Sequence, residues 1–215
     1  GAEIKERTNG ILEEVGLKID HEEVTGKLPA AGCRELASGM IAFPRELVAE
    51  CVAQAPASVR LAAHGDGETV DIRAGGPTVF WTGNALHLAE GRETKPIGEE
   101  EFIKLTRVAD ALDHVHAPVG PANHDLPAQY RDFVACRIMA EHSGKHLRPC
   151  IYTPRGGRAI CEMGQVLAGS QSLADWPTIS FGYTIISPLH WGEAAMEVFA
   201  QTSGFGAPMM INSEP

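Results

Sequence analysis

The chain has 215 residues, of which 44% are hydrophobic and 21% are charged, and its formal net charge is −10 at pH 7. This composition is typical of a globular protein with a sizeable core and excludes a disordered chain. Nucleic acids and anionic membranes require clustered Lys and Arg, so the expected partner is a small molecule or another protein. The longest apolar stretch, residues 179–189, contains Gly, Ser and Pro and is too short to span a membrane.

The cysteines are irregularly spaced, and none belongs to a C-x-x-C pair; they are Cys33, Cys51, Cys136, Cys150 and Cys161. Their odd number predicts reduced thiols and a cytoplasmic protein. Two histidine pairs, His114 with His116 and His142 with His146, have no cysteine or carboxylate at metal-site spacing, so no metal is expected. The chain begins inside a helical pattern and ends inside a strand pattern, and we expect both ends to be cuts.

Helical patterns dominate the first part of the chain. Apolar residues at helical spacing predict a first helix that ends at Gly16. Asp20, with Glu23 three residues later, forms a capping-box pattern that predicts the start of a second helix. Pro44 is expected at the first position of a third helix.

Strand patterns follow the third predicted helix. Gly65-Asp66-Gly67 separates two alternating runs and predicts a hairpin. Further strands are expected around residues 77–81 and 85–88, and Gly91 turns the chain again. We therefore expect a mixed α/β N-terminal cap over residues 1–98.

A regular alternation of strands and helices is expected over residues 99–215. Strand-like runs start near Val115, Leu147, Thr178 and Pro208, at intervals of 30 to 32 residues, with helix-like runs between them. This spacing indicates about four βα units with parallel strands. The dinucleotide fingerprint is absent after the first of these strands, which favours the first half of a truncated (β/α)8 TIM-type barrel over an open doubly wound sheet.

Active groups of such a barrel lie where the strands end and in the loops that follow. This rule selects Asn123, His124, Asp125, Tyr152, Thr153, Arg155, Ser187, His190, Asn212, Ser213 and Glu214, with Tyr183 pointing inward from the third strand. His124 and Asp125 suit a general base with a carboxylate, or polar contacts to a substrate. Alternatively, Asp125 caps a helix that starts at Pro127.

Two further patterns predict ligand contacts. Tyr152, Tyr183, Trp191 and Trp81 could hold a cationic ligand if their rings cluster, whereas a single ring is expected in the core. The segment from Arg155 through Gly156 and Gly157 lies where a strand passes into a helix, and its N–H groups could hold a carboxylate or phosphate.

The order of several motifs resembles the trimethylamine methyltransferase family. The segment 184–189, TIISPL, is followed 19 residues later by the segment 208–213, PMMINS. The runs EEVGLKIDHEEV and IAFPRELVAECVAQAP, which end at Val24 and Pro56, and the loop 121–127 agree in order. The resemblance covers the whole chain and stops within the barrel.

The resemblance implies a (β/α) barrel that transfers a methyl group from a methylated amine to the Co(I) of a corrinoid (cobalamin) on a separate partner protein. It implies a tertiary or quaternary amine such as trimethylamine or glycine betaine, and no tightly bound cofactor. Residues suited to hold the amine are His124, Asp125, Tyr152, Arg155, Tyr183, His190 and Asn212, while no catalytic residue is assigned. The archetypal enzyme of the family carries pyrrolysine in the second half of its barrel, and this chain alone is expected to be inactive.

Two other classes of protein fit the same patterns. A barrel of the uroporphyrinogen decarboxylase type would require an Arg-rich site for several carboxylates, and the sequence has no such cluster. A non-catalytic binding or assembly module is the second alternative. Unpaired strand edges of a half barrel would favour a homo-oligomer.

Overall fold

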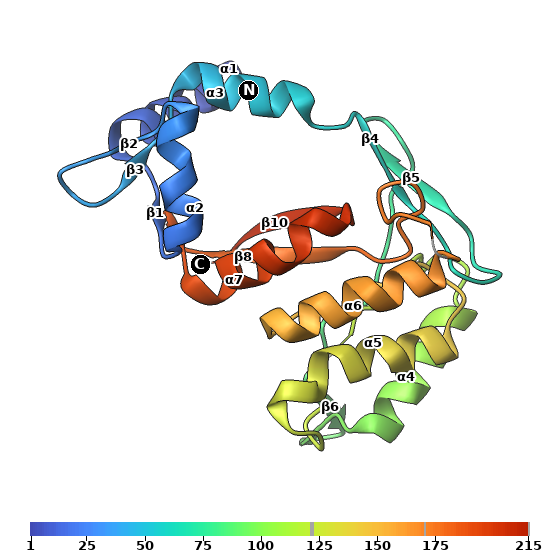
Figure 1. Ribbon diagram of the computed structural model, residues 1–215. Helices are drawn as coiled ribbons and strands as arrows, with labels where there is room; N and C mark the ends of the chain where they lie inside the picture. Colours follow the sequence, from blue (N-terminus) through green and yellow to red (C-terminus); the bar gives the residue numbers. More distant parts are fainter. Residues whose placement is uncertain (121–122, 170, 215) are drawn as a thin grey trace. The chain divides into compact units, whose positions relative to one another are not determined.

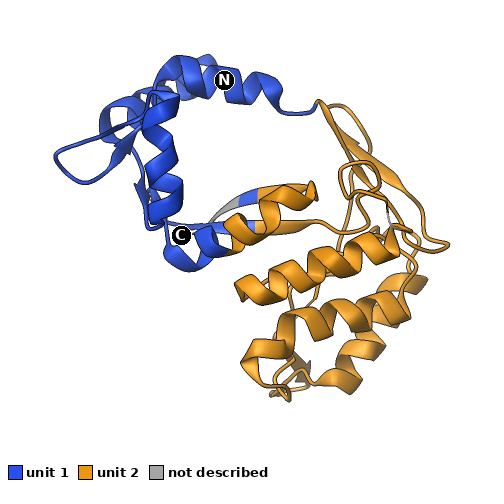
Figure 2. Ribbon diagram, viewed as in Figure 1, with its two compact units in different colours: residues 1–56, 183–197, 211–215 blue, residues 57–182, 198–210 orange. Residues whose placement is uncertain are grey.

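The computed structural model describes residues 1–120, 123–169 and 171–214, without the side chains of residues 212–214. The chain divides into two compact units (Figure 2). Unit 1 comprises residues 1–56, 183–197 and the stretch from 211 onward, and unit 2 comprises residues 57–182 and 198–210. The boundary after residue 56 does not coincide with the expected boundary at residue 98, and the division into a cap and half a barrel stays a prediction.

Unit 1 is built from short elements (Figure 1). They are α1 (Ala2–Gly10), the π-helical turn η1 (Ile11–Val15), β1 (Lys18–Ile19), α2 (Glu22–Lys27), the 3-10 turn η2 (Leu28–Ala31), β2 (Arg34–Glu35), β3 (Ile41–Ala42), α3 (Arg45–Gln54) and β9 (His190–Trp191). Strands β2 and β3 are antiparallel. Strand β1 is parallel to β9, with Lys18 opposite His190.

Gly16 ends the first helical stretch, as predicted. Its φ is +77°, and a Cβ atom at this position would collide with the carbonyl oxygen of Ile41. Only glycine combines this backbone conformation with so close an approach. The approach lets Leu17 and Ile41 exchange two backbone hydrogen bonds of 2.8 Å. The end of the helix is therefore fixed by packing against β3 as well as by local preference.

The cap of α2 differs from the prediction. The helix begins at Glu22, and the Nδ1 atom of His21 accepts the backbone N–H of Val24 at 3.3 Å. Asp20 does not cap the helix, because its carboxylate lies 2.6 Å from the Nε2 atom of His190. The predicted capping box at Asp20 is thus wrong, since a partner distant in the sequence binds that carboxylate.

Unit 2 contains two hairpins. Strands β4 (Ser58–Leu61) and β5 (Val70–Arg73) form the predicted hairpin, and β6 (His87–Glu90) pairs with β7 (Glu93–Pro96). The first turn packs closely on the segment around Lys145, because a Cβ atom at Gly67 would lie 2.7 Å from the Cα atom of that residue.

Parallel pairing in unit 2 begins earlier than expected. Trp81 is bridged in parallel to Ala117, Val119 to Arg148, and Leu147 to Ile179. Extended segments 80–82, 116–120, 147–148 and 178–181 therefore follow one another in parallel. The first of these segments lies within the predicted cap of residues 1–98. The β6–β7 hairpin lies between segment 80–82 and the next helix. This βα unit is therefore longer than usual, and its spacing does not indicate a βα unit in the sequence.

Helices connect these parallel segments. They are α4 (Glu99–Ala111), the 3-10 turn η3 (Ala128–Tyr130), α5 (Arg131–His142) and α6 (Pro154–Leu167). Figure 1 shows α4, α5 and α6 side by side. The core of unit 2 includes Phe102, Met139, Leu147, Ile160 and Ile179, each at most 2% exposed.

The last elements are β8 (Phe181–Ile186), α7 (Glu193–Thr202), the 3-10 turn η4 (Ser203–Phe205) and β10 (Met209–Glu214). The turn η4 belongs to unit 2, whereas β8, α7 and β10 each have residues in both units. Within unit 2, the N–H of Phe181 donates to the carbonyl oxygen of Pro208 at 3.3 Å. The fold is therefore mixed α/β with a parallel series, and closure into a barrel stays a prediction.

Candidate functional site

Polar residues follow three successive parallel segments of unit 2. Asn84 comes after segment 80–82, Asn123 after 116–120, and Tyr152 after 147–148. The carboxyl ends of parallel strands lie at one edge of a sheet, so these side chains belong to the same edge. Asn84 was missed in the sequence because its strand was assigned to the cap.

Cys150 and Asn84 lie beside the Tyr152 hydroxyl and interact with it electrostatically. Burial raises the pKa of the Tyr152 phenol to about 12, so it is protonated at neutral pH. The side chain is nevertheless 45% exposed. A neutral phenol with part of its ring open can present its aromatic face to a cation.

Arg148 lies on the strand that leads to Tyr152. Its guanidinium carbon is 4.8 Å from the centre of the Trp81 ring, on the segment two places along the series. Burial lowers the pKa of this guanidinium. One face of Trp81 is thereby occupied by a cation of the chain itself, and a ligand contact of this ring stays a prediction.

The Asn123 side chain is fully buried, and neither its Oδ1 nor its Nδ2 atom has a hydrogen-bond partner among the described residues. Leaving a buried amide unpaired costs about 1–3 kcal/mol for each group. Such a cost is tolerated where a ligand or water completes the hydrogen bonds, so we include Asn123 in the candidate site.

The anion site predicted at Arg155, Gly156 and Gly157 is filled by the protein itself. The buried carboxylate of Asp132 accepts the N–H of Thr153 at 3.0 Å and its hydroxyl at 2.9 Å. It also accepts the N–H of Tyr152 at 3.3 Å. Asp132 thus takes the place of an external anion at the start of α6, and Arg155 is exposed.

His124 and Asp125 are exposed, and both contact other residues of the protein. The Asp125 carboxylate accepts the N–H of Glu99 at 2.9 Å and so caps α4, whose own cap residue, Gly98, has no side chain. The expected cap of a helix at Pro127 is therefore wrong. The His124 ring lies 5.6 Å from the ring of His87, centre to centre.

The other predicted residues belong to unit 1. Tyr183 is 3% exposed and lies within β8. His190 lies 2.6 Å from Asp20, and hydrogen bonding to His190 lowers the pKa of that carboxyl. The Asn212 side chain lies outside the described part of the chain. A cage that combines Tyr183 with Tyr152 stays a prediction.

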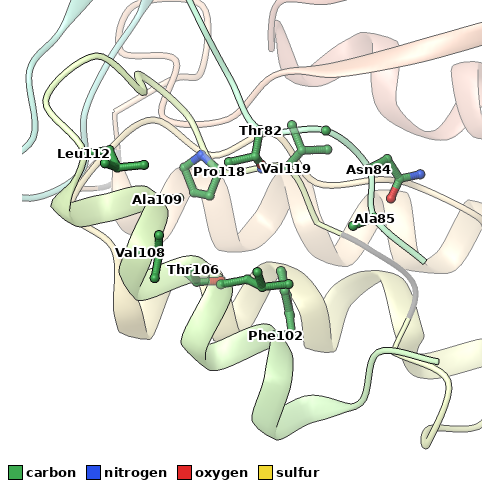
Figure 3. A pocket seen from close by; sticks show the side chains of 12 residues that line it. Thr82, Asn84, Ala85, Phe102, Thr106, Val108, Ala109, Leu112, Pro118 and Val119 are labelled. Atoms are coloured by element: carbon green, nitrogen blue, oxygen red, sulfur yellow. The ribbon is translucent and has the colours of Figure 1, made fainter. Parts of the chain in front are cut away.

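A cavity of about 460 Å³ lies between α4 and the segments at 82–85 and 118–119. Figure 3 shows Phe102, Thr106 and Ala109 of α4 on one side, with Pro118 and Val119 opposite. Asn84 lines one end, so the cavity reaches a residue that lies beside the Tyr152 phenol. None of the side chains that line it carries a charge.

Among the residues that the structure describes, no group of three His, Cys, Asp or Glu side chains could hold a metal ion. No helix within the described ranges is long and apolar enough to cross a membrane.

Comparison with known proteins gives a family and a fold. The family model for trimethylamine methyltransferase (MTTB) matches residues 2–213. No curated protein matches the sequence. The monomethylamine methyltransferase MtmB of Methanosarcina barkeri is similar in structure, with a TM-score of 0.56 and 13% identity, and a hydroxylamine complex of MtmB gives 0.57 and 16%. Each likeness covers 100% of this chain and 50% of the solved one, so the chain spans half the length of those structures.

Proposed function

Because the chain belongs to the trimethylamine methyltransferase family, we propose that its protein transfers a methyl group from a methylated amine to a corrinoid on a separate partner protein. The family match over residues 2–213 is the observation that carries this proposal. The likeness to MtmB supports it at the level of the fold and supports a TIM-type barrel for the whole protein. The location proposed is the cytoplasm.

The candidate site suits an amine substrate. The Tyr152 ring can face a tertiary or quaternary ammonium group such as trimethylamine or glycine betaine. Asn84 lies beside the Tyr152 phenol, and Asn123 offers at the same edge an amide without a hydrogen-bond partner among the described residues. These groups are neutral at pH 7, so they bind and orient the amine without taking up its proton.

The corrinoid supplies the nucleophile when its protein is bound. The task left to this chain is to hold the methyl group in line and to exclude water from it. The side chains of Asn84, Asn123 and Tyr152 at the edge of the sheet fit this task. A partner protein docked at this edge would cover them and exclude water. A homo-oligomer is also proposed, and sedimentation of the protein would show it.

A methyl-transfer assay tests the proposed function. The full-length protein is incubated with cob(I)alamin and, in turn, trimethylamine, glycine betaine, proline betaine and carnitine, and the visible absorbance is followed. Conversion of the corrinoid with one of these amines supports the proposal. A folded protein that converts none of them contradicts it.

A further inference from the structure

Asp132 is a buried carboxylate that binds the loop with Tyr152. It lies in the first turn of α5 and is fully buried. Its Oδ2 atom accepts the N–H of Tyr152 at 3.3 Å, the N–H of Thr153 at 3.0 Å and the Thr153 hydroxyl at 2.9 Å. Its Oδ1 atom accepts the N–H of Phe133 at 2.9 Å. Apart from the bond to Phe133, all of these bonds go to the loop between segment 147–148 and α6.

These bonds fix the backbone on both sides of the Tyr152 side chain. A loop residue is ordinarily more mobile than the elements that it joins. Here the N–H groups of two successive residues converge on one carboxylate oxygen, as in a backbone nest that binds an anion. The Thr153 hydroxyl also accepts the N–H of Gly156 at 3.0 Å and so caps α6. Tyr152 is therefore attached to the start of α5 as well as to the start of α6.

The capping of α6 does not require a carboxylate at position 132, because Thr153 already supplies the cap. Removing a charge from water costs free energy, which hydrogen bonds must offset. What Asp132 adds is a fixed backbone at Tyr152, whose side chain is 45% exposed. Its charge also reaches the phenol, since Asp132 contributes, after burial, to the raised pKa of Tyr152.

We propose that Asp132 is a positioning residue of the candidate site, which holds Tyr152 in the orientation in which its ring receives an ammonium group. This inference rests on the proposed function. Asp132 is fully buried, so it acts through Tyr152 and not by contact with the amine. A substitution at position 132 should therefore move the Tyr152 ring and weaken amine binding only while that ring is present.

Fluorine NMR of the full-length protein tests the position of the ring without a ligand. Tyrosine is replaced by 3-fluorotyrosine, and the resonance that Tyr152→Phe removes belongs to Tyr152. Asp132→Asn keeps the shape of the side chain but places an amide NH₂ group against N–H donors. The Tyr152 resonance should therefore move toward that of the free amino acid. Asp110→Asn is the matched control and should leave it in place, because this carboxylate accepts the Ser143 hydroxyl at 2.8 Å and the Gly144 N–H at 3.0 Å instead.

Thr153→Val is a second variant, which keeps the carboxylate and removes only the hydroxyl that donates to it. The Tyr152 resonance should move in the same direction by a smaller amount. This variant decides the question if Asp132→Asn does not fold. A Tyr152 resonance that stays in place in the folded variants, or that moves as far in Asp110→Asn, would overturn the inference.

Methyl-transfer kinetics test the effect on the amine, with whichever of trimethylamine, glycine betaine, proline betaine and carnitine the unmodified protein demethylates. Asp132→Asn should raise KM about 2- to 30-fold, which is the contribution of a cation–π contact. A merely structural role would lower the amount of active protein and leave KM unchanged. In protein that carries Tyr152→Ala, Asp132→Asn should raise KM no further, because the two residues act as one unit.

Additive effects of Asp132→Asn and Tyr152→Ala on KM would also overturn the inference. If the folded, unmodified protein demethylates none of the four amines, the proposed function is contradicted instead. The fluorine resonance would then still show whether Asp132 positions Tyr152, so the two failures are distinguishable.

Discussion

Gly156 allows α6 to start on a buried carboxylate. A Cβ atom at this position would collide with the Asp132 carboxylate, which already accepts hydrogen bonds from Tyr152 and Thr153. The carboxylate is fully buried and cannot swing into water. Close packing at this point therefore ties the loop that carries Tyr152 to α5.

Gly156→Ala should lower the free energy of unfolding by about 2–4 kcal/mol, because the added methyl group displaces Asp132 from its donors. Gly204→Ala is the control in the same unit, since a Cβ atom at Gly204 has no neighbour within 4 Å. Its effect should stay within about 0.5 kcal/mol. Denaturant unfolding measures both, and equal effects of the two substitutions would rule out the collision as the cause.

His146 makes stability depend on pH. Its Nδ1 atom lies 3.0 Å from the carbonyl oxygen of Pro177, and its Nε2 atom lies 2.8 Å from the Ser180 hydroxyl. Carbonyls only accept, so Nδ1–H donates to Pro177 and the neutral ring accepts from Ser180. Burial lowers the pKa of His146 to about 4, below its ordinary value of 6.5.

The unfolded chain therefore takes up a proton at higher pH than the folded one. The stabilisation from neutral His146 is present above pH 6.5 and is lost as the pH falls from about 6.5 to about 4, by up to about 3 kcal/mol. Urea unfolding at pH 7 and at pH 4.5 measures this slope. His146→Gln should be less stable at pH 7 with a shallower slope, and an unchanged slope would show that other groups cause it.

At the scale of elements, Lys145 binds the carbonyl groups at the end of α4. The Nζ atom of Lys145 donates to the carbonyl oxygens of Ala109, Leu112 and Val115 at 2.9, 2.7 and 2.7 Å. These carbonyls end the helix and begin the next strand, and a cation there also suits the helix dipole. Lys145 thus joins a helix to the segment that enters the parallel series.

Lys145→Met should destabilise the protein by about 1–3 kcal/mol, because it leaves carbonyls without a donor. Lys104→Met is the control on α4 itself, where the exposed ion pair with Glu100 contributes about 0–1 kcal/mol. Thermal unfolding compares them, and a loss in Lys104→Met as large as that in Lys145→Met would contradict this role.

Local signals explain which elements were predictable from the sequence. Gly16 and the Gly65-Asp66-Gly67 turn act over a few residues, and each led to a correct prediction. The intervals of 30 to 32 residues between the later strands also predicted that these strands are parallel. The segment 80–82 was misplaced, because parallel pairing joins residues far apart in the sequence and an inserted hairpin hid its βα unit.

The candidate site was less predictable for the same reason. Tyr152 could be found from its place after a strand, whereas Arg148 and Asn84 depend on contacts with Trp81 and Tyr152 that no spacing rule indicates. The glycines at the start of α6 predicted a bound carboxylate or phosphate. They could not show that Asp132, a carboxylate of the chain itself, lies against Gly156.

At the scale of the whole molecule, the family match and the candidate site point to the same function. The family match covers residues 2–213, and the polar groups gather where parallel segments end. Under the proposed function, Tyr152 would hold the ammonium group of a methylated amine at that edge, where a docked corrinoid protein could reach its methyl group. The fate of that methyl group therefore tests the proposed function.

The most direct measurement follows a ¹³C-labelled methyl group by NMR. The full-length protein is given glycine betaine labelled in its N-methyl groups, together with cob(I)alamin as acceptor. The account predicts that the label appears on the corrinoid and that dimethylglycine accumulates in equal amount. Label that stays on the amine in the presence of folded protein, while every other methylated amine of the panel also remains intact, would contradict it.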